Sequence, residues 1–137
     1  MNNSDELIQI WMNFSKFHNR ITRALDQVLQ QKYQLGLNEF YFLIFLNEAQ
    51  EKKLRLSELQ KMVGLSQSAL SRLVSRLEQH HLQVVERASF DKDKRSVYAL
   101  LTPSGGQYIV EIMKEINIVL EQSLSTKDIL NLKLFAE

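Results

Sequence analysis

The chain has 137 residues, a formal net charge of +1 and no cysteine. This length is typical of a single domain that buries a core without cross-links, and the lack of cysteine excludes disulfides, Cys-ligated metals and thiol-based redox sensing. The first residues do not resemble a signal peptide, and no apolar run approaches the ~18–20 residues that span a bilayer, so we expect a cytoplasmic protein without membrane contact.

The amino-terminal third is typical of two helices. Ser4 is a candidate N-cap for a helix that ends near Tyr33. Its apolar stripe consists of Leu7, Ile8, Trp11, Phe14, His18, Ile21, Leu25, Val28 and Leu29. After Gly36, Asn38 can cap a second helix. Because segment 40–46 is apolar on nearly all sides, we expect this helix in the centre of the fold.

The middle of the chain is typical of a helix-turn-helix. A short strand at 54–55 precedes a helix that begins at Ser57 and ends at Gly64, and Ser66 then caps a second helix that ends near His80. The inward side chains are expected to be Leu59, Met62 and Val63 in the first helix and Leu70, Leu73, Val74 and Leu77 in the second. The outward positions of the second helix are polar.

A β-hairpin follows the helix pair. Segments 84–88 and 96–101 are β-prone, and the charged stretch 89–95 between them has the length of a hairpin loop. A hairpin directly after a helix-turn-helix predicts a wing. Thr102 as N-cap and Pro103 at the first helical position then begin a long helix.

The terminal helices carry more apolar surface than a winged core alone can cover. The long helix presents Ile109, Ile112, Met113, Ile116, Val119 and Leu120, and a last helix capped by Ser125 or Thr126 presents Ile129, Leu130, Leu132, Leu134 and Phe135. We therefore expect a homodimer whose interface is formed by residues 4–20 and 105–136. Trp11, Phe14 and Phe17 are interpreted as interface residues, and the alternative is a pocket for a small aromatic molecule.

The outward face of the second motif helix is the candidate DNA-binding surface. A major groove about 12 Å wide admits one helix, and short hydroxyl and amide side chains on its first turns can reach base edges. The wing cations are positioned for phosphate or minor-groove contact, and Asp93 can brace Arg95. The predicted DNA-binding residues are Ser66, Gln67, Ser68, Ser71, Arg72, Ser75 and Arg76 on the helix and Lys92, Asp93, Lys94 and Arg95 in the wing.

Charge distribution favours the same segment. Residues 52–98 hold ten Lys and Arg against five Asp and Glu, whereas the two flanks together are net acidic. A basic segment is often only a solvated face, so this asymmetry alone leaves both interpretations open.

With these motifs the sequence resembles the MarR family of winged helix-turn-helix regulators. The matching motifs are Leu56-x-x-Leu59, Leu65-Ser66-x-Ser68-x-x-Ser71-Arg72-x-x-x-x-Leu77-Glu78, Asp93-x-Arg95-Ser96 and Leu101-Thr102-x-x-Gly105. The resemblance implies a mainly α fold with a small β wing, a DNA-binding lobe at 37–101, and dimerisation helices at 4–35 and 103–137 of one domain. It also implies a sequence-specific repressor that binds duplex DNA at an inverted repeat.

A small aromatic effector is expected to bind between the first helix, the second helix and the start of the helix at Pro103 and to release the DNA.

The sequence departs from the family pattern around the wing. His81 stands where the family usually has the glycine that ends the recognition helix, and histidine tolerates the left-handed conformation better than most side chains but less well than glycine. The segment between Leu82 and Arg87 is two residues longer than is usual in the family, and Phe90 stands at a position that is commonly Asp. The orientation of the wing is therefore expected to differ from the one usual in the family.

Other functional classes find little support in the sequence. There is no phosphate-binding Gly-rich loop, no catalytic triad spacing and no paired carboxylates in an apolar setting, so we expect neither an enzyme nor a cofactor. His80 and His81 face different sides of a helix and do not predict a metal site. The alternative to a regulator is a winged-helix architectural or protein-interaction module without an effector.

Overall fold

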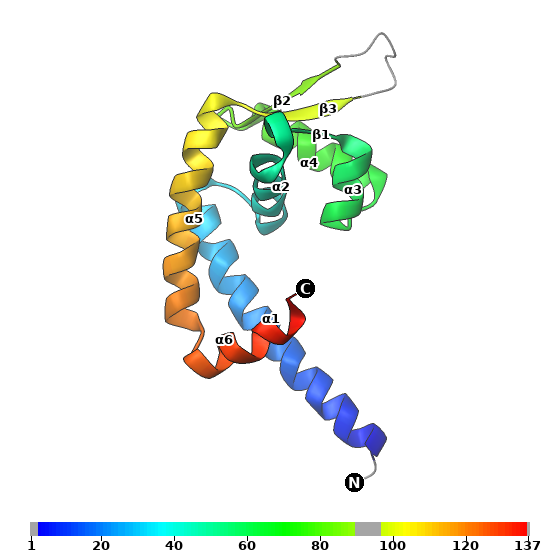
Figure 1. Ribbon diagram of the computed structural model, residues 1–137, viewed down its shortest axis with the longest axis vertical. Coiled ribbons are helices and arrows are strands. Elements are labelled where there is room, and N and C mark those ends of the chain that lie inside the picture. The colour runs from blue at the N-terminus through cyan, green and yellow to red at the C-terminus, as the bar shows by residue number, and fades with distance from the viewer. Residues whose placement is uncertain (1–2, 90–96, 137) are drawn as a thin grey trace. The chain divides into compact units, whose positions relative to one another are not determined.

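A computed structural model describes residues 3–89 and 97–136. The elements in chain order are α1 (Asn3–Tyr33), α2 (Leu37–Glu48), η1 (Gln50–Lys52), β1 (Lys53–Arg55), α3 (Leu56–Val63), α4 (Gln67–Gln79), β2 (Val85–Ala88), β3 (Tyr98–Leu101), α5 (Pro103–Ser123), α6 (Thr126–Leu132) and η2 (Lys133–Phe135) (Figure 1). The predicted fold class, mainly helical with a small β wing, is confirmed. Two compact units are formed, one by Met1–Gln34 with Lys114–Glu137 and the other by Leu35–Met113.

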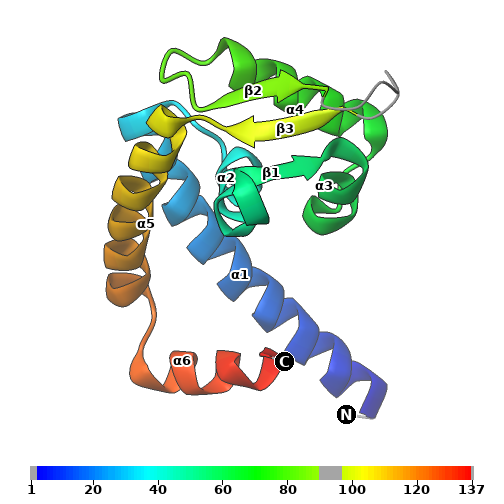
Figure 2. The same ribbon diagram turned by 45° about the horizontal axis from the view of Figure 1, so that its top comes forward.

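The second unit is built around one antiparallel sheet. The strand order is β1-β3-β2, so the last strand in sequence lies in the centre, as Figure 2 shows. Helix α2 contacts α3, β1 and β3, and α4 contacts β2. The buried side chains of α2 and α4 are Phe40, Phe42, Leu43, Leu46, Leu70, Leu73, Val74 and Leu77. Both the central helix and the inward stripe of the second motif helix thus lie where the sequence predicts.

Three helices begin earlier than predicted. Helix α1 begins at Asn3, so Ser4 is not its N-cap. Helix α2 is capped by Gly36 instead of Asn38, and helix α3 by Arg55, one residue before its first helical residue. In α2 and α3 the carboxylate three residues after the cap accepts a hydrogen bond from the cap amide, at 3.1 Å for Glu39 and 3.3 Å for Glu58. This bond satisfies a helix-end donor without a capping hydroxyl.

One predicted inward residue is exposed, because Met62 in α3 has 47% of its surface open to solvent. Helix α3 has eight residues, and Leu59 is its buried side chain. Leu59 thus anchors the helix, and the last turn reaches solvent at Met62.

The segment after α4 resolves the question raised by His81. His80 ends the helix, Gln83 N donates to the His80 carbonyl at 3.0 Å, and Leu82 N donates to His80 Nδ1 at 3.1 Å. The positive φ of 54° falls on Gln83, and His81 is not among the described residues with positive φ. The left-handed residue after α4 is therefore Gln83, two residues beyond the position where the family usually has glycine.

The first turn of α5 holds this segment in place. Thr102 Oγ1 donates to the Gln83 carbonyl at 2.6 Å and accepts from Gly105 N at 2.9 Å, as expected of an N-cap, while Thr102 N donates to the Val84 carbonyl at 3.0 Å. Gly105 lies so close that a Cβ there would clash with the Val84 carbonyl oxygen and lie 2.7 Å from a methyl carbon of Leu101. The Thr102-x-x-Gly105 motif thus follows from close packing.

In the first unit, α1 and α5 are joined by an ion pair between Lys32 Nζ and Glu115 Oε2 at 2.6 Å. Ser125 caps α6, with its hydroxyl accepting from Asp128 N at 3.0 Å, which settles the choice between Ser125 and Thr126.

Within the described residues, the structure contains no helix both long enough and apolar enough to cross a membrane.

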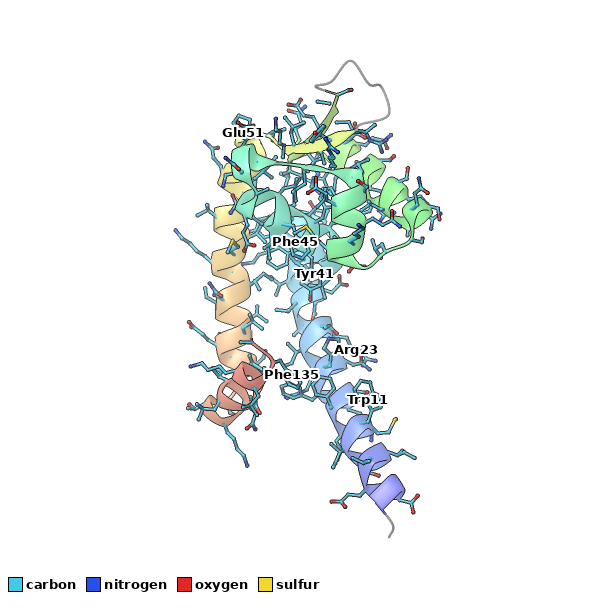
Figure 3. All side chains as sticks on the ribbon, turned by 45° about the vertical axis from the view of Figure 1, so that its right-hand side comes forward. Trp11, Arg23, Tyr41, Phe45, Glu51 and Phe135 are labelled. Atoms are coloured by element: carbon cyan, nitrogen blue, oxygen red, sulfur yellow. The ribbon has the colours of Figure 1, made fainter. Side chains whose placement is uncertain are left out.

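This unit exposes a large apolar surface. On α1 the stripe is buried at its carboxyl-terminal half, whereas Trp11 is 66% exposed. Figure 3 shows Trp11 on α1 and Phe135 near the end of the chain, and the Phe14 and Phe135 rings lie 6.1 Å apart. The exposed large apolar residues of this unit are Leu7, Ile8, Ile10, Trp11, Met12, Phe14, Ile118, Ile129, Leu130, Leu134 and Phe135. Exposure of this many large apolar side chains is typical of an interaction site.

Candidate nucleic-acid interface

The turn between α3 and α4 is set by two residues. Gly64 ends α3 with φ 77°, a left-handed conformation that glycine adopts without steric cost. Ser66 then caps α4, and its hydroxyl accepts from Ala69 N at 3.2 Å. Both positions agree with the sequence prediction. The turn leaves one side of α4 facing the core and the other facing solvent.

The outer side of α4 brings the predicted helix residues together. Ser66 has its hydroxyl engaged in the cap, and Ser75 is half-buried. The other members, Gln67, Ser68, Ser71, Arg72 and Arg76, are exposed. A row of hydroxyl, amide and guanidinium groups can donate to and accept from base edges in a major groove. Lys92, Asp93, Lys94 and Arg95 lie outside the described residues.

A hollow of about 320 Å³ lies beside this row. Its lining includes Arg55, Ser57 and Gln60 together with Gln67 and Ser71, so the start of α3 continues the polar surface of α4. Sequence reasoning assigned Arg55 to a strand and gave it no functional role. Its only sequence signal was a cation immediately before the motif helix.

Arg55 is held against the sheet by an aromatic ring. Its Nε donates to Tyr98 Oη at 2.9 Å, and its guanidinium carbon lies 5.5 Å from the centre of that ring. Lys53 Nζ lies 5.7 Å from the same centre. Tyr98 pairs with Arg55 across β1 and β3. The strand register therefore gathers two cations beside the first motif helix.

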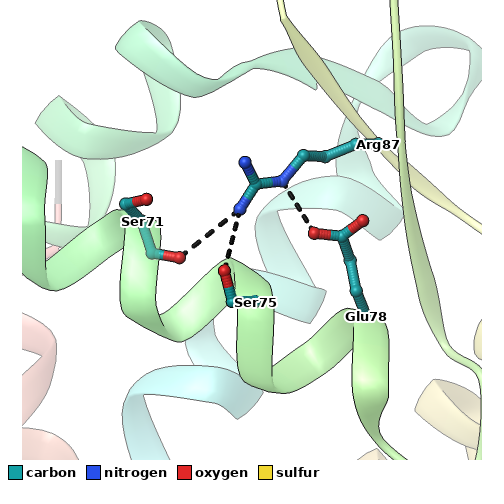
Figure 4. Close-up of polar contacts among 4 residues, drawn as sticks. All are labelled: Ser71, Ser75, Glu78 and Arg87. Atoms are coloured by element: carbon teal, nitrogen blue, oxygen red, sulfur yellow. Dashed lines mark hydrogen bonds and ion pairs between the residues drawn. The ribbon is translucent and has the colours of Figure 1, made fainter.

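Arg87 is a second cation that the sequence did not single out. It lies in β2, and its guanidinium crosses to α4, where Nε lies 2.7 Å from Glu78 Oε1. Nη2 donates to Ser75 Oγ at 3.2 Å and to the Ser71 carbonyl at 3.4 Å (Figure 4). Two of the three partners, Ser71 and Ser75, belong to the predicted DNA-binding set. The base of the wing is thus tied directly to that helix.

The known proteins with similar sequences are transcriptional regulators. The family model described as transcriptional regulator SarA/Rot matches residues 24–116. The HTH-type transcriptional regulator TcaR of Staphylococcus aureus is 27% identical over 129 residues, which cover 92% of this chain and 83% of TcaR. More than half of the chain thus matches a single family of regulators.

Solved structures share the fold. Sco3205, a MarR family transcriptional regulator from Streptomyces coelicolor solved in complex with DNA, superposes with a TM-score of 0.83 at 24% identity over 96% of this chain and 83% of that one. BpsR of Bordetella bronchiseptica, described as regulated in its DNA binding by 6-hydroxynicotinic acid, gives a TM-score of 0.74 at 16% identity over 90% and 86% of the two chains. The chain therefore belongs to the SarA/Rot family of transcriptional regulators and has the winged-helix fold of the MarR family structures.

Proposed function

We propose that this regulator is a repressor that binds duplex DNA in the cytoplasm as a homodimer, with α4 in the major groove. The observation that carries the proposal is the exposed row Gln67, Ser68, Ser71 and Arg72 on the outer side of a helix whose inner side is buried. The similarity to Sco3205, solved with DNA, supports it. The described residues offer a binding surface of this kind, and we propose no catalytic activity.

The operator is proposed to be an inverted repeat. The exposed apolar residues of α1, α6 and η2 are the proposed dimer interface, which should bury well over the ~1,200 Å² of weak encounters. A two-fold symmetric dimer places two recognition helices in successive major grooves when they lie about 34–36 Å apart. Half-site centres about ten base pairs apart are therefore expected.

Gel shifts on the DNA next to the gene, at several salt concentrations, test this function. Affinity should fall steeply with salt because Lys and Arg contacts release counterions. Arg72→Ala should weaken operator binding by about 1–3 kcal/mol while sparing unrelated DNA, because it removes a base contact. Lys94→Ala, in the segment that the sequence predicts as the wing tip, should weaken binding to all sequences alike and reduce the slope of log affinity against log salt concentration by about one.

These variants also separate the alternatives. A protein-interaction winged helix would show no salt-dependent binding to any duplex. An architectural DNA binder would show the salt-dependent affinity, but Arg72→Ala would lower its affinity for operator and for unrelated DNA equally. Intact operator affinity in Arg72→Ala would remove α4 from the proposal.

We also propose a small aromatic acid as an effector, supported by the similarity to BpsR, whose DNA binding is described as regulated by such a compound. An effector can lower DNA affinity only by its preference for the DNA-free state, typically about 1–3 kcal/mol. By linkage, operator DNA must weaken effector binding by the same factor. Calorimetry with 6-hydroxynicotinic acid should therefore give a weaker Kd for the DNA-bound protein, and equal Kd values would exclude that compound as an inducer.

A further inference from the structure

The contacts of Arg87 are arranged as a bridge between two elements. Strand β2 carries the residue, and all three acceptors lie on α4 within two turns, at Ser71, Ser75 and Glu78. The Arg87 and Glu78 side chains are 33% and 34% exposed, so the pair is partly shielded from water. Charge-assisted bonds in such a setting are stronger than those of a fully exposed pair.

Resting on the proposed function, we propose that Arg87 is a positioning residue that orients the recognition helix. It acts through Ser71, Ser75 and Glu78 and fixes the rotation of α4 relative to the base of the wing. Helix α4 and the wing must enter adjacent parts of the same DNA, so their mutual orientation decides whether base contacts and wing contacts form together. Arg87 sets this orientation before DNA is bound.

A direct phosphate contact is the obvious role for an arginine beside a DNA-reading helix. Here the Nε and Nη2 groups of Arg87 face the helix, and the carboxylate of Glu78 sits against them. That carboxylate would repel a phosphate at this edge. Because guanidinium is planar with donors on three nitrogens in a fixed fork, it can span a carbonyl, a hydroxyl and a carboxylate at once, whereas the three donors of an ammonium share one nitrogen and lack this spacing.

The sign of the effect of Glu78→Gln distinguishes the two roles. Removal of a negative charge beside DNA should strengthen binding to any duplex by simple electrostatics. If Glu78 holds Arg87 in place, operator affinity should instead fall about three- to tenfold, while affinity for unrelated DNA does not fall. Glu86→Gln is the matched control, because it removes the same charge one residue from Arg87 on the other face of β2.

Variants of Arg87 complete the test. Arg87→Lys keeps the charge but lacks the planar fork that spaces the donors over the three acceptors, so it should lose operator affinity about as much as Arg87→Gln. Both should keep the wild-type salt slope, whereas loss of a phosphate contact would lower it by about one. The double variant Glu78→Gln with Arg87→Gln should bind the operator no more weakly than Arg87→Gln alone. Operator affinity in Glu78→Gln equal to or above that of Glu86→Gln, or wild-type affinity in Arg87→Lys, would overturn the proposal.

Hydrogen exchange on the DNA-free protein gives an independent measurement. The amides of residues 75–79 should exchange faster in Arg87→Gln and in Glu78→Gln than in Glu86→Gln, because the end of α4 loses its tie to β2. Unchanged exchange would contradict the bridge. If the wild-type protein bound no duplex at all, the proposed function would fail, and the exchange rates would still decide whether Arg87 orients α4.

Discussion

Trp11→Glu is expected to convert the protein from a dimer to a monomer. Trp11 is 66% exposed, yet it lies on the stripe of α1 that continues into buried Ile21 and Leu25. In the proposed dimer this position is covered by the partner subunit, and a carboxylate there would lose its water without gaining a cation, at a cost of several kcal/mol. Light scattering at micromolar concentration should report half the wild-type mass.

The loss of the dimer should be visible in DNA binding. A dimer that contacts two linked half-sites binds about 10²–10⁴ times more tightly than one subunit on one half-site. Operator affinity should therefore drop by a factor of at least about 10². Gln9→Glu is the control, because it adds the same charge to α1 on the side where Gln9 Nε2 donates to Asn13 Oδ1 at 3.1 Å. That variant should remain dimeric. A monomeric wild-type protein, or a dimeric Trp11→Glu, would contradict the proposed interface.

Gly105→Ala is expected to destabilise the protein, and Gly106→Ala to stabilise it. At Gly105 the added methyl would overlap the Val84 carbonyl oxygen, which is backbone and already accepts from Thr102 N, so relief requires α5 to shift. Overpacking of this kind costs about 1–3 kcal/mol. At Gly106 the added methyl meets nothing within 4 Å. Alanine in a helix is favoured over glycine by about 0.5–1 kcal/mol.

Chemical denaturation measures this difference at equal protein concentration, since oligomerisation contributes to apparent stability. The two variants change the same residue type in the same turn of α5, so helix propensity cancels between them. What remains is the contact with the 82–84 segment. Equal stabilities of the two variants would show that α5 does not pack closely there.

The sequence predicted the parts of the fold that depend on periodic burial. The stripe Leu70, Leu73, Val74 and Leu77 identified both the inner and the outer side of α4, because a helix repeats every 3.6 residues. The helix starts were less accurate. Glu39 and Glu58 each accept from the cap amide, but a helix start is predicted from a serine, threonine, asparagine or aspartate as the cap, and Gly36 and Arg55 are none of these.

The candidate site was predicted where it is local in sequence and missed where it is not. The row on α4 follows from one helix. Arg87 reaches Ser71 across 16 residues and Arg55 reaches Tyr98 across 43, so both depend on strand register and on the docking of the sheet against α4. The left-handed conformation of Gln83 likewise depends on how the chain runs from His80 to β2, which the residue type alone does not reveal.

The contacts at the start of α5 determine where the chain can tolerate a change in length. Thr102 and Ser104 hold the carbonyls of Gln83 and Leu82, so the chain is fixed just before β2 begins. Residues added between His80 and this fixed point enlarge a solvent-facing turn and leave β2 in register with β3. A change in the length of that turn should therefore leave α4 and β2 in place, because the contacts of Thr102 and Ser104 fix the chain between the turn and the strand.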